Sequence, residues 1–159
     1  MRIVTDGREQ HDEWSLLAAD EPLDGQAAIV PLARWQAISP ATGMSTYGLL
    51  AQADDALAAV LAAALRSPLV AIEFATFNDG RGYSLARQLR ANGFNRDLRA
   101  VGEVLRDQAF YLARCGFSSF APAAHVGSDE FVAGLADFSL VYQAAADDRS
   151  IIARLRQMR

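Results

Sequence analysis

Residues 69–74 read LVAIEF, an almost unbroken apolar run bounded by Pro68 and by the polar loop at residues 78–82. A run of this length is typical of a strand buried on both faces of a sheet. Residues 83–92 then carry apolar side chains at helical spacing, and they are followed by Gly93, the residue type that commonly ends a helix in the left-handed conformation. This stretch therefore predicts one unit of strand, loop and helix.

The same unit repeats further along the chain. Residues 99–104 (RAVGEV) predict a second strand, Asp107 the start of a second helix and Gly116 its end. A short strand at residues 118–121 and a helix from Ser128 to about residue 136 follow. Alternation of strand and helix at this spacing predicts right-handed βαβ units and a parallel sheet. A complete eight-stranded barrel takes about 250 residues, so we expect an α/β fold with an open, mainly parallel sheet and helices on both faces.

The remaining parts of the chain complete a single domain of 159 residues. Asp6-Gly7 and Asp24-Gly25 are turn signals between short apolar runs, so residues 1–46 predict a strand-rich segment with short antiparallel strands. Residues 47–143 predict the βα units, and residues 144–159 a C-terminal helix or tail. Within the βα units, residues 47–51 predict a buried strand, Asp54 a helix N-cap, and residues 138–143 (FSLVYQ) a last strand.

The composition excludes several chemistries. The chain is 52% hydrophobic and 21% charged with a net charge of -4, as in ordinary soluble globular proteins. All 15 basic residues are Arg, so a Schiff-base lysine and a P-loop lysine are excluded. The single cysteine, Cys115, cannot form an internal disulfide or supply a four-thiolate cluster.

Charge and hydropathy also predict the compartment. Residues 1–25 are acidic throughout and lack the apolar core of a signal peptide, which predicts a cytoplasmic protein. The longest apolar stretch, residues 56–65, is about half as long as a bilayer span, so no membrane segment is expected. The acidic balance argues against nucleic-acid binding, which normally rests on a positive field.

Two loops of the predicted sheet leave its carboxyl edge, where open parallel sheets bind ligands. The first loop brings Arg81, Gly82 and Ser84 to a helix start, and the second brings Arg106. Helix N-termini and guanidinium groups both attract oxyanions, so these four residues are the candidate anion site. The dinucleotide fingerprint fails because Leu85 stands where its third glycine belongs. In the alternative interpretation the first loop only caps its helix and the Arg residues form structural ion pairs.

Glu73 and Glu103 are each the lone acid of an apolar strand. In neighbouring strands with matching register their carboxylates would lie about 5 Å apart. Such a pair would share a proton, bind a cation or be neutralised by Arg81, Arg99 or Arg106. A divalent metal usually needs a third carboxylate or His, and the following strand at residues 118–121 supplies none, so no metal site is predicted. Cys115 is expected to pack at a helix end, and His11 and His125 to face solvent.

The residues that carry a family resemblance lie mainly in the central block, at 78–87, 98–108 and 113–117, with Trp14, residues 32–35 and Phe138-Ser139 outside it. They resemble a bacterial family of unknown function whose members are commonly labelled "oxidoreductase probably involved in sulfite reduction". Genes of that family often lie beside the gene for the sulfite reductase haemoprotein. The family pattern has Asp at the positions of Glu73 and Glu103, and Lys at the position of Thr76.

The resemblance implies a part in sulfite reduction, with sulfite reductase as a partner. An electron carrier needs a cofactor, and the sequence offers no thiolate set, no dinucleotide fingerprint and no redox pair of cysteines. We therefore expect an accessory of assimilatory sulfite reduction that has no redox cofactor of its own. The alternative is a small enzyme or sensor that binds an oxyanion-bearing metabolite at the carboxyl edge of the sheet.

Overall fold

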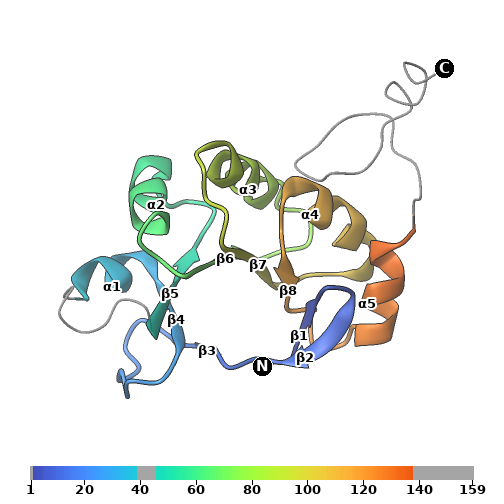
Figure 1. Ribbon diagram of the computed structural model, residues 1–159, viewed down its shortest axis with the longest axis horizontal. Coiled ribbons are helices and arrows are strands. Elements are labelled where there is room, and N and C mark those ends of the chain that lie inside the picture. The colour runs from blue at the N-terminus through green and yellow to red at the C-terminus, as the bar shows by residue number, and fades with distance from the viewer. Residues whose placement is uncertain (1, 39–45, 138–159) are drawn as a thin grey trace.

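A computed structural model describes residues 2–38 and 46–137. These residues form one sheet of eight strands in the order β2-β1-β8-β7-β6-β5-β4-β3, and the helices pack around it (Figure 1). The strands are β1 (Arg2–Thr5), β2 (Arg8–His11), β3 (Ser15–Leu16), β4 (Ala28–Pro31), β5 (Tyr47–Ala51), β6 (Leu69–Phe74), β7 (Asp97–Gly102) and β8 (Ser119–Phe120). The helices are α1 (Leu32–Ala37), α2 (Leu57–Ala64), α3 (Arg81–Ala91), the single 3-10 turn η3 (Arg106–Gln108), α4 (Ala109–Cys115) and α5 (Ser128–Leu135). The predictions for residues 138–143 and 144–159 fall outside the described residues.

The pairing of the strands confirms the α/β class. Strands β3 to β8 pair in parallel, while β1 runs antiparallel to both β8 and β2. The sequence predicted this mainly parallel sheet with antiparallel strands at its N-terminus. Strand β6 occupies the predicted residues and pairs with β7 along its whole length, as expected for a strand buried on both faces of a parallel sheet.

Helices cover only one face of the sheet in the described part of the chain, whereas the sequence predicted helices on both faces. The parallel strands follow one another in chain order from β3 to β8, so successive right-handed crossovers place every helix on the same side. Covering both faces requires a reversal of strand order, and the sequence pattern does not reveal that order. Figure 1 shows the result, a curled sheet with its helices outside the curl.

The curl brings the two edge strands of the sheet together. Strands β2 and β3 stand at opposite ends of the strand order, yet only Asp12, Glu13 and Trp14 separate them in the chain. Four steps of extended chain reach about 14 Å at most, so the end of β2 and the start of β3 lie within that distance of each other. The residues of this connection, which we call the seam, bridge the open side of the curl.

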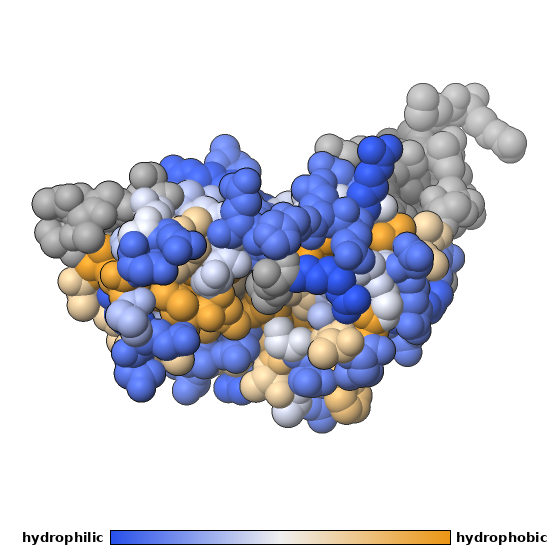
Figure 2. Space-filling model, turned by 90° about the horizontal axis from the view of Figure 1, so that it is seen from below, coloured by the Kyte–Doolittle hydropathy of each residue, from blue (hydrophilic) through white to orange (hydrophobic). Residues whose placement is uncertain are grey.

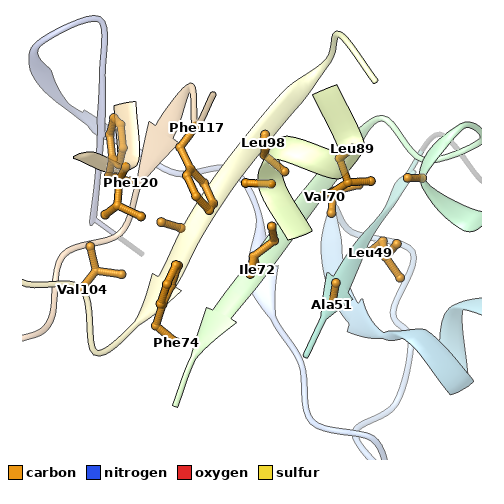
Figure 3. Packing of buried hydrophobic residues seen from close by; sticks show 14 of the residues in the cluster. Leu49, Ala51, Val70, Ile72, Phe74, Leu89, Leu98, Val104, Phe117 and Phe120 are labelled. Carbon is orange, nitrogen blue, oxygen red and sulfur yellow. The ribbon is translucent and has the colours of Figure 1, made fainter. Parts of the chain in front are cut away.

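Two separate groups of buried side chains hold the structure together. The larger group lies between the sheet and the helices and includes Phe74, Leu98 and Phe120 from the strands and Leu89 from α3 (Figure 3). The smaller group lies on the inner, concave face and comes from the strands, the residue after β8 and the seam: Ile3, Ile29, Leu50, Leu69, Ala71, Val101 and Ala121, with Trp14 packed against them. Figure 2 shows a side of the molecule on which hydrophobic side chains form a band across the middle, with hydrophilic ones above and below it. Among the described helices, none is long and apolar enough to cross a bilayer.

Candidate functional site at the carboxyl edge

The carboxyl ends of β5, β6 and β7 lie side by side and carry the candidate residues. Glu73 is on the same face of β6 as Leu69 and Ala71, the inner face of the sheet. Its Oε2 accepts a hydrogen bond of 2.6 Å from Nε2 of Gln52, the residue that follows β5. Within the described residues Glu73 forms no ion pair, so a half-buried carboxylate sits at this edge with a neutral amide as its partner.

Glu73 and Glu103 are not in matching register. Glu73 stands opposite Val101, because β7 begins at Asp97 and ends at Gly102, two residues earlier than the sequence predicted. Gly102 has a φ of +92°, and an added Cβ there would clash with the carbonyl oxygen of Phe74. The chain therefore turns at this glycine, and Glu103 follows it in an exposed position. The expected spacing of one strand between the two carboxylates does not apply.

Arg81 is the first residue of α3 and is held by Asp79 of its own loop. Its Nη2 lies 2.8 Å from Asp79 Oδ2, and its Nε and backbone N–H both donate to Oδ1. The hydrogen bonds from Arg81 lower the pKa of Asp79, and the same side-chain bond raises the pKa of Arg81. Asp79 therefore binds the first backbone N–H of α3 and neutralises the cation of its own loop, and this ion pair agrees with the alternative interpretation of the sequence.

Gly82 and Ser84 lie in different surroundings. Gly82 is buried, and a Cβ added to it would stand 2.7 Å from Cζ of Phe74, so this glycine lets α3 approach the sheet closely. Ser84 is exposed and lines a hollow of about 190 Å³ between the starts of α2 and α3. Arg81 lines the same hollow, together with Gln52 and Gln88. Of the four candidate residues, these two share a surface.

Arg106 is the first residue of η3, and its partners are different carboxylates from the one that binds Arg81. Its Nη2 lies 2.7 Å from Asp137, beyond the end of α5, and its Nη1 lies 3.5 Å from Asp107. These two carboxylates raise the pKa of Arg106, and the hydrogen bond that Arg106 donates to Asp137 has the larger effect. Arg106 is not among the residues that line the hollow beside Arg81, so each of the two cations is engaged by carboxylates of its own region.

Gln108 joins the two loops and was missed by the sequence analysis. Its Nε2 donates to the carbonyl oxygen of Phe77, at 2.8 Å, and to the hydroxyl of Tyr83, at 3.0 Å. Its Oε1 accepts from the backbone N–H of Leu105. A glutamine three residues after a helix start, reaching back to the backbone, is a capping signal that the sequence did contain.

Arg99 does not neutralise the two glutamates, although the sequence left that role open. Its guanidinium lies on the inner face, where it donates to Asp12 of the seam, to Asp97 and to Ser119. The register places Arg99 beside Ala71, nearer the start of β6 than Glu73. The hydrogen bonds of this buried arginine therefore have a structural role.

A hollow of about 880 Å³ lies at the opposite, amino edge of the sheet. Arg90 and Arg96 line it, and both donate to backbone carbonyls: Arg90 to those of Phe94, Arg96 and Gly116, and Arg96 to those of Leu65 and Ser67. Residues Leu65 and Gly116 are the C-caps of α2 and α4. The two arginines therefore satisfy carbonyls at the negative ends of helices, which is a structural role.

The other reactive side chains are dispersed. Cys115 is buried in the last turn of α4, while His11 and His125 are exposed. No group of three His, Cys, Asp or Glu side chains within residues 2–38 and 46–137 is arranged to hold a metal ion.

The comparison with family models identifies the group of proteins to which this chain is related. A model described as "Bacterial protein of unknown function (DUF934)" matches residues 48–152, well over half of the chain. The chain belongs to the bacterial family DUF934. Comparisons with curated proteins and with solved structures found no match.

The DUF934 match begins one residue into β5 and spans the described elements up to α5. It therefore includes both loops at the carboxyl edge, with Arg81 and Arg106, and both glutamates. Strands β1 to β4, the seam and α1 lie before it. The family region thus contains the candidate site and α2 to α5, while the residues before it contribute to both faces of the sheet, with Val4, Ala28 and Val30 on the helix-covered face and Ile3 and Ile29 on the inner face.

Proposed function

We propose that this protein is an accessory of assimilatory sulfite reduction that has no redox cofactor of its own. The observation that carries the proposal is the central block at residues 78–117, whose motifs resemble the proteins labelled for sulfite reduction. This block forms α3, α4 and the loops at the carboxyl edge of β6 and β7, and that edge is where open α/β sheets bind ligands.

The electrostatics of this edge support a binding role over acid–base catalysis. A general acid or base works best when its pKa lies near the working pH. Here hydrogen bonding lowers the pKa of Asp79 and raises the pKa values of Arg81 and Arg106. Each of these groups is thereby moved further from neutrality and held in its charged form.

Growth of a deletion strain tests the proposal. Deleting the gene should slow growth with sulfate as sole sulfur source, and cysteine should restore it, because cysteine bypasses sulfite reduction. The wild-type gene supplied in trans is the control. Normal growth on sulfate, in a strain without a second copy of the gene, would remove the pathway assignment. A flavin or haem bound to the purified protein would instead contradict the statement that it has no redox cofactor.

A second candidate function, binding of an oxyanion-bearing metabolite, is favoured by one observation. Arg81 and Ser84 line the same hollow beside the first turn of α2, where no side chain caps the helix. The side chain of Arg81 is 66% exposed despite its contact with Asp79, so its guanidinium is accessible to an anion. A helix start and a guanidinium both suit sulfite, sulfate, phosphate or a carboxylate.

Thermal stability in the presence of anions tests this second candidate. Sulfate, sulfite or phosphate at millimolar concentration should raise the Tm above that in chloride of equal ionic strength. Arg81→Ala should abolish the rise, whereas Arg87→Ala, an exposed position of the same helix, should retain it. The comparison uses the anion-dependent rise and not the Tm itself, because Arg81→Ala also removes the contact with Asp79. Equal rises in both variants would exclude the site.

A further inference from the structure

Helix α2 presents an apolar side to solvent. Residues 56–65 read ALAAVLAAAL, ten consecutive positions without a polar side chain. A helix that is apolar on every side is normally buried on every side. In α2 the buried residues are Val60, Ala63 and Ala64, because this helix lies on the outside of the curl between α1 and α3 (Figure 1). In the described part of the chain, its opposite side stays exposed.

Four residues make up this exposed side, which we call the α2 face: Ala58, Leu61, Ala62 and Leu65. They are spaced by three, one and three residues, so they lie on one side of a helix. Ala58 and Ala62 are exposed, Leu61 is half-buried and Leu65 is 58% exposed. Leu57, at the border of the α2 face, is 40% exposed. Apolar side chains gathered on a surface commonly mark a contact site.

Hydrogen bonds hold the last turn of α2 in place. The backbone N–H of Leu65 donates to the carbonyl of Leu61. Nη1 of Arg96 donates to the carbonyls of Leu65 and Ser67, at 3.1 and 2.7 Å, and so attaches the end of α2 to the residue before β7. Leu65 is therefore presented by an ordered backbone. An apolar anchor that is already in position loses little entropy when it is covered.

The α2 face is complementary to itself when two copies of the helix run antiparallel. In the register that places Leu61 of one copy opposite Ala62 of the other, Ala58 lies opposite Leu65. Each large side chain then meets a small one, which lets the two helices interdigitate. A two-fold axis between the copies produces each of these contacts twice. Parallel helices would instead place Leu65 against Leu65 and Ala58 against Ala58, with poorer packing at both positions.

The charges at the two ends of α2 favour the same orientation. Asp54 and Asp55 precede the helix, and Arg66 follows its C-cap. Antiparallel packing brings the acidic start of one helix to the basic end of the other, and it does so at both ends of the contact. It also places the negative end of each helix dipole beside the positive end of the other. Parallel packing would bring like charges together.

From this self-complementarity we propose that two copies of the chain associate through α2, antiparallel about a two-fold axis, with their α2 faces buried against each other. One short helix covers less than the about 800 Å² per partner of a standard interface, so the dimer is reversible and depends on concentration. Helix α2 starts at the carboxyl edge of the sheet, so the two carboxyl edges point in opposite directions and stay accessible. This inference does not depend on the function proposed above.

Cysteine cross-linking in the full-length chain tests the proposal. Cys115 is buried and should not react, which wild-type protein taken through the same oxidation checks. Ala62→Cys should give a disulfide-linked dimer, because the two positions 62 are offset by one residue, about 1.5 Å along the helix axis. Ala58→Cys alone should not, because the two positions 58 are offset by seven residues, about 10 Å, which is beyond the reach of a disulfide.

Mixing two variants tests the orientation of the helices. Ala58→Cys mixed with Leu65→Cys should form a disulfide between the variants, because these positions lie opposite each other in the antiparallel register. Neither variant should cross-link with itself. Gln10→Cys, at an exposed position of β2, is the control for cross-linking by random collision and should give little product.

Sedimentation of the chain without added cysteines measures the association itself. The weight-average mass should rise with concentration toward that of two chains. Ala62→Glu should remain monomeric, because it buries a charge in the middle of the contact. Phe77→Ser, which removes an exposed apolar side chain on another surface, should associate like the wild type. Circular dichroism of the variants checks that both remain folded.

The opposite results would overturn the proposal. Cross-linking of Ala58→Cys with itself, or of Leu65→Cys with itself, above the level of Gln10→Cys would indicate parallel helices. A mass that does not change with concentration, or an association that Ala62→Glu leaves intact, would show that a second copy does not cover the α2 face. Protection of a thiol at position 62 from alkylation in the monomer would assign the α2 face to another part of the same chain.

Discussion

Arg99 of β7 and Asp12 of the seam form a buried ion pair across 87 positions of the sequence, with 2.7 Å between Nη1 and Oδ2. Both residues are almost completely buried, at 3% and 5% exposure. The second oxygen of Asp12 accepts from the backbone N–H of Trp14, and the remaining groups of Arg99 are bound by Asp97 and Ser119. The pair therefore attaches the connection between the two sheet edges to the middle of the inner face.

Removing the carboxylate of Asp12 should destabilise the protein strongly. Asp12→Ala leaves Arg99 buried with a reduced set of partners, and breaking a buried pair from one side costs about 3 kcal/mol or more. For a chain of this size that corresponds to a fall in Tm of about 10 °C. Denaturant and thermal unfolding measure the change.

The matched control for Asp12→Ala is Glu9→Ala, three residues earlier on the exposed strand β2. A surface change of this kind should alter stability by about 0.5 kcal/mol or less. If the two variants unfold alike, the seam is not held by the ion pair.

The fold class was accessible from the sequence, but the shape of the sheet was not. The apolar run at residues 69–74 identifies a doubly buried strand because its composition alone requires it. The curl depends on strand order and on contacts such as Arg99 with Asp12, which join residues far apart in the chain. Helix α1 was not predicted, since six residues after a strand give too short a pattern to separate from the strand itself.

Substituting Gly82 by alanine should weaken the contact between α3 and the sheet. The new Cβ would lie 2.7 Å and 2.8 Å from ring atoms of the buried Phe74. Overpacking of this kind costs about 1–3 kcal/mol, which exceeds the gain of about 1 kcal/mol in helix propensity. We expect a net loss of stability in urea unfolding.

Gly80→Ala is the control for this site. An added Cβ at Gly80 meets nothing within 4 Å, and its φ of −71° suits any residue. Stability should stay constant or rise slightly. Combining Gly82→Ala with Phe74→Leu should recover part of the loss, since the smaller side chain makes room. Strict additivity of the two changes would contradict the steric explanation.

The contact between Asp79 and Arg81 predicts a pH effect. Because hydrogen bonds from Arg81 lower the pKa of Asp79 below its ordinary value of 3.8, the carboxylate favours the folded loop at pH above that value. This contribution is lost as the pH falls through the lowered pKa. An NMR titration of the Asp79 side chain should show a midpoint below 3.8 in the wild type, and Arg81→Gln should move it back up. An unchanged midpoint in the variant would show that the pair does not form in solution.

The sequence predicted the positions of individual residues of the candidate site better than it predicted their arrangement in space. The sequence placed Arg81 and Arg106 after neighbouring strands, and the structure has them there. Their partners depend on loop geometry: Asp79 is two residues from Arg81, but Asp137 reaches Arg106 only because α5 packs against η3. The register of Glu103 depends on the turn at Gly102, which a glycine in a predicted strand suggests without specifying.

The last prediction concerns Arg90, because all 15 Lys and Arg positions of the chain hold arginine and this one has contacts that suit a guanidinium. Its Nε donates to the carbonyl of Gly116 at 2.8 Å, and its Nη1 donates to those of Phe94 and Arg96 at 2.7 and 2.8 Å. The planar fork of a guanidinium bridges such acceptors, whereas an ammonium is a single point of charge.

Arg90→Lys should therefore leave at least one carbonyl unpaired and cost about 1–3 kcal/mol. Burial already lowers the pKa of Arg90, and it should likewise lower the pKa of a lysine at this position, so the deficit should grow as the pH rises into the alkaline range. The control Arg87→Lys changes an exposed residue of the same helix and should be neutral by the same unfolding measurement. Equal stability of the two variants at pH 7 and pH 10 would show that the three carbonyl contacts contribute nothing to the fold.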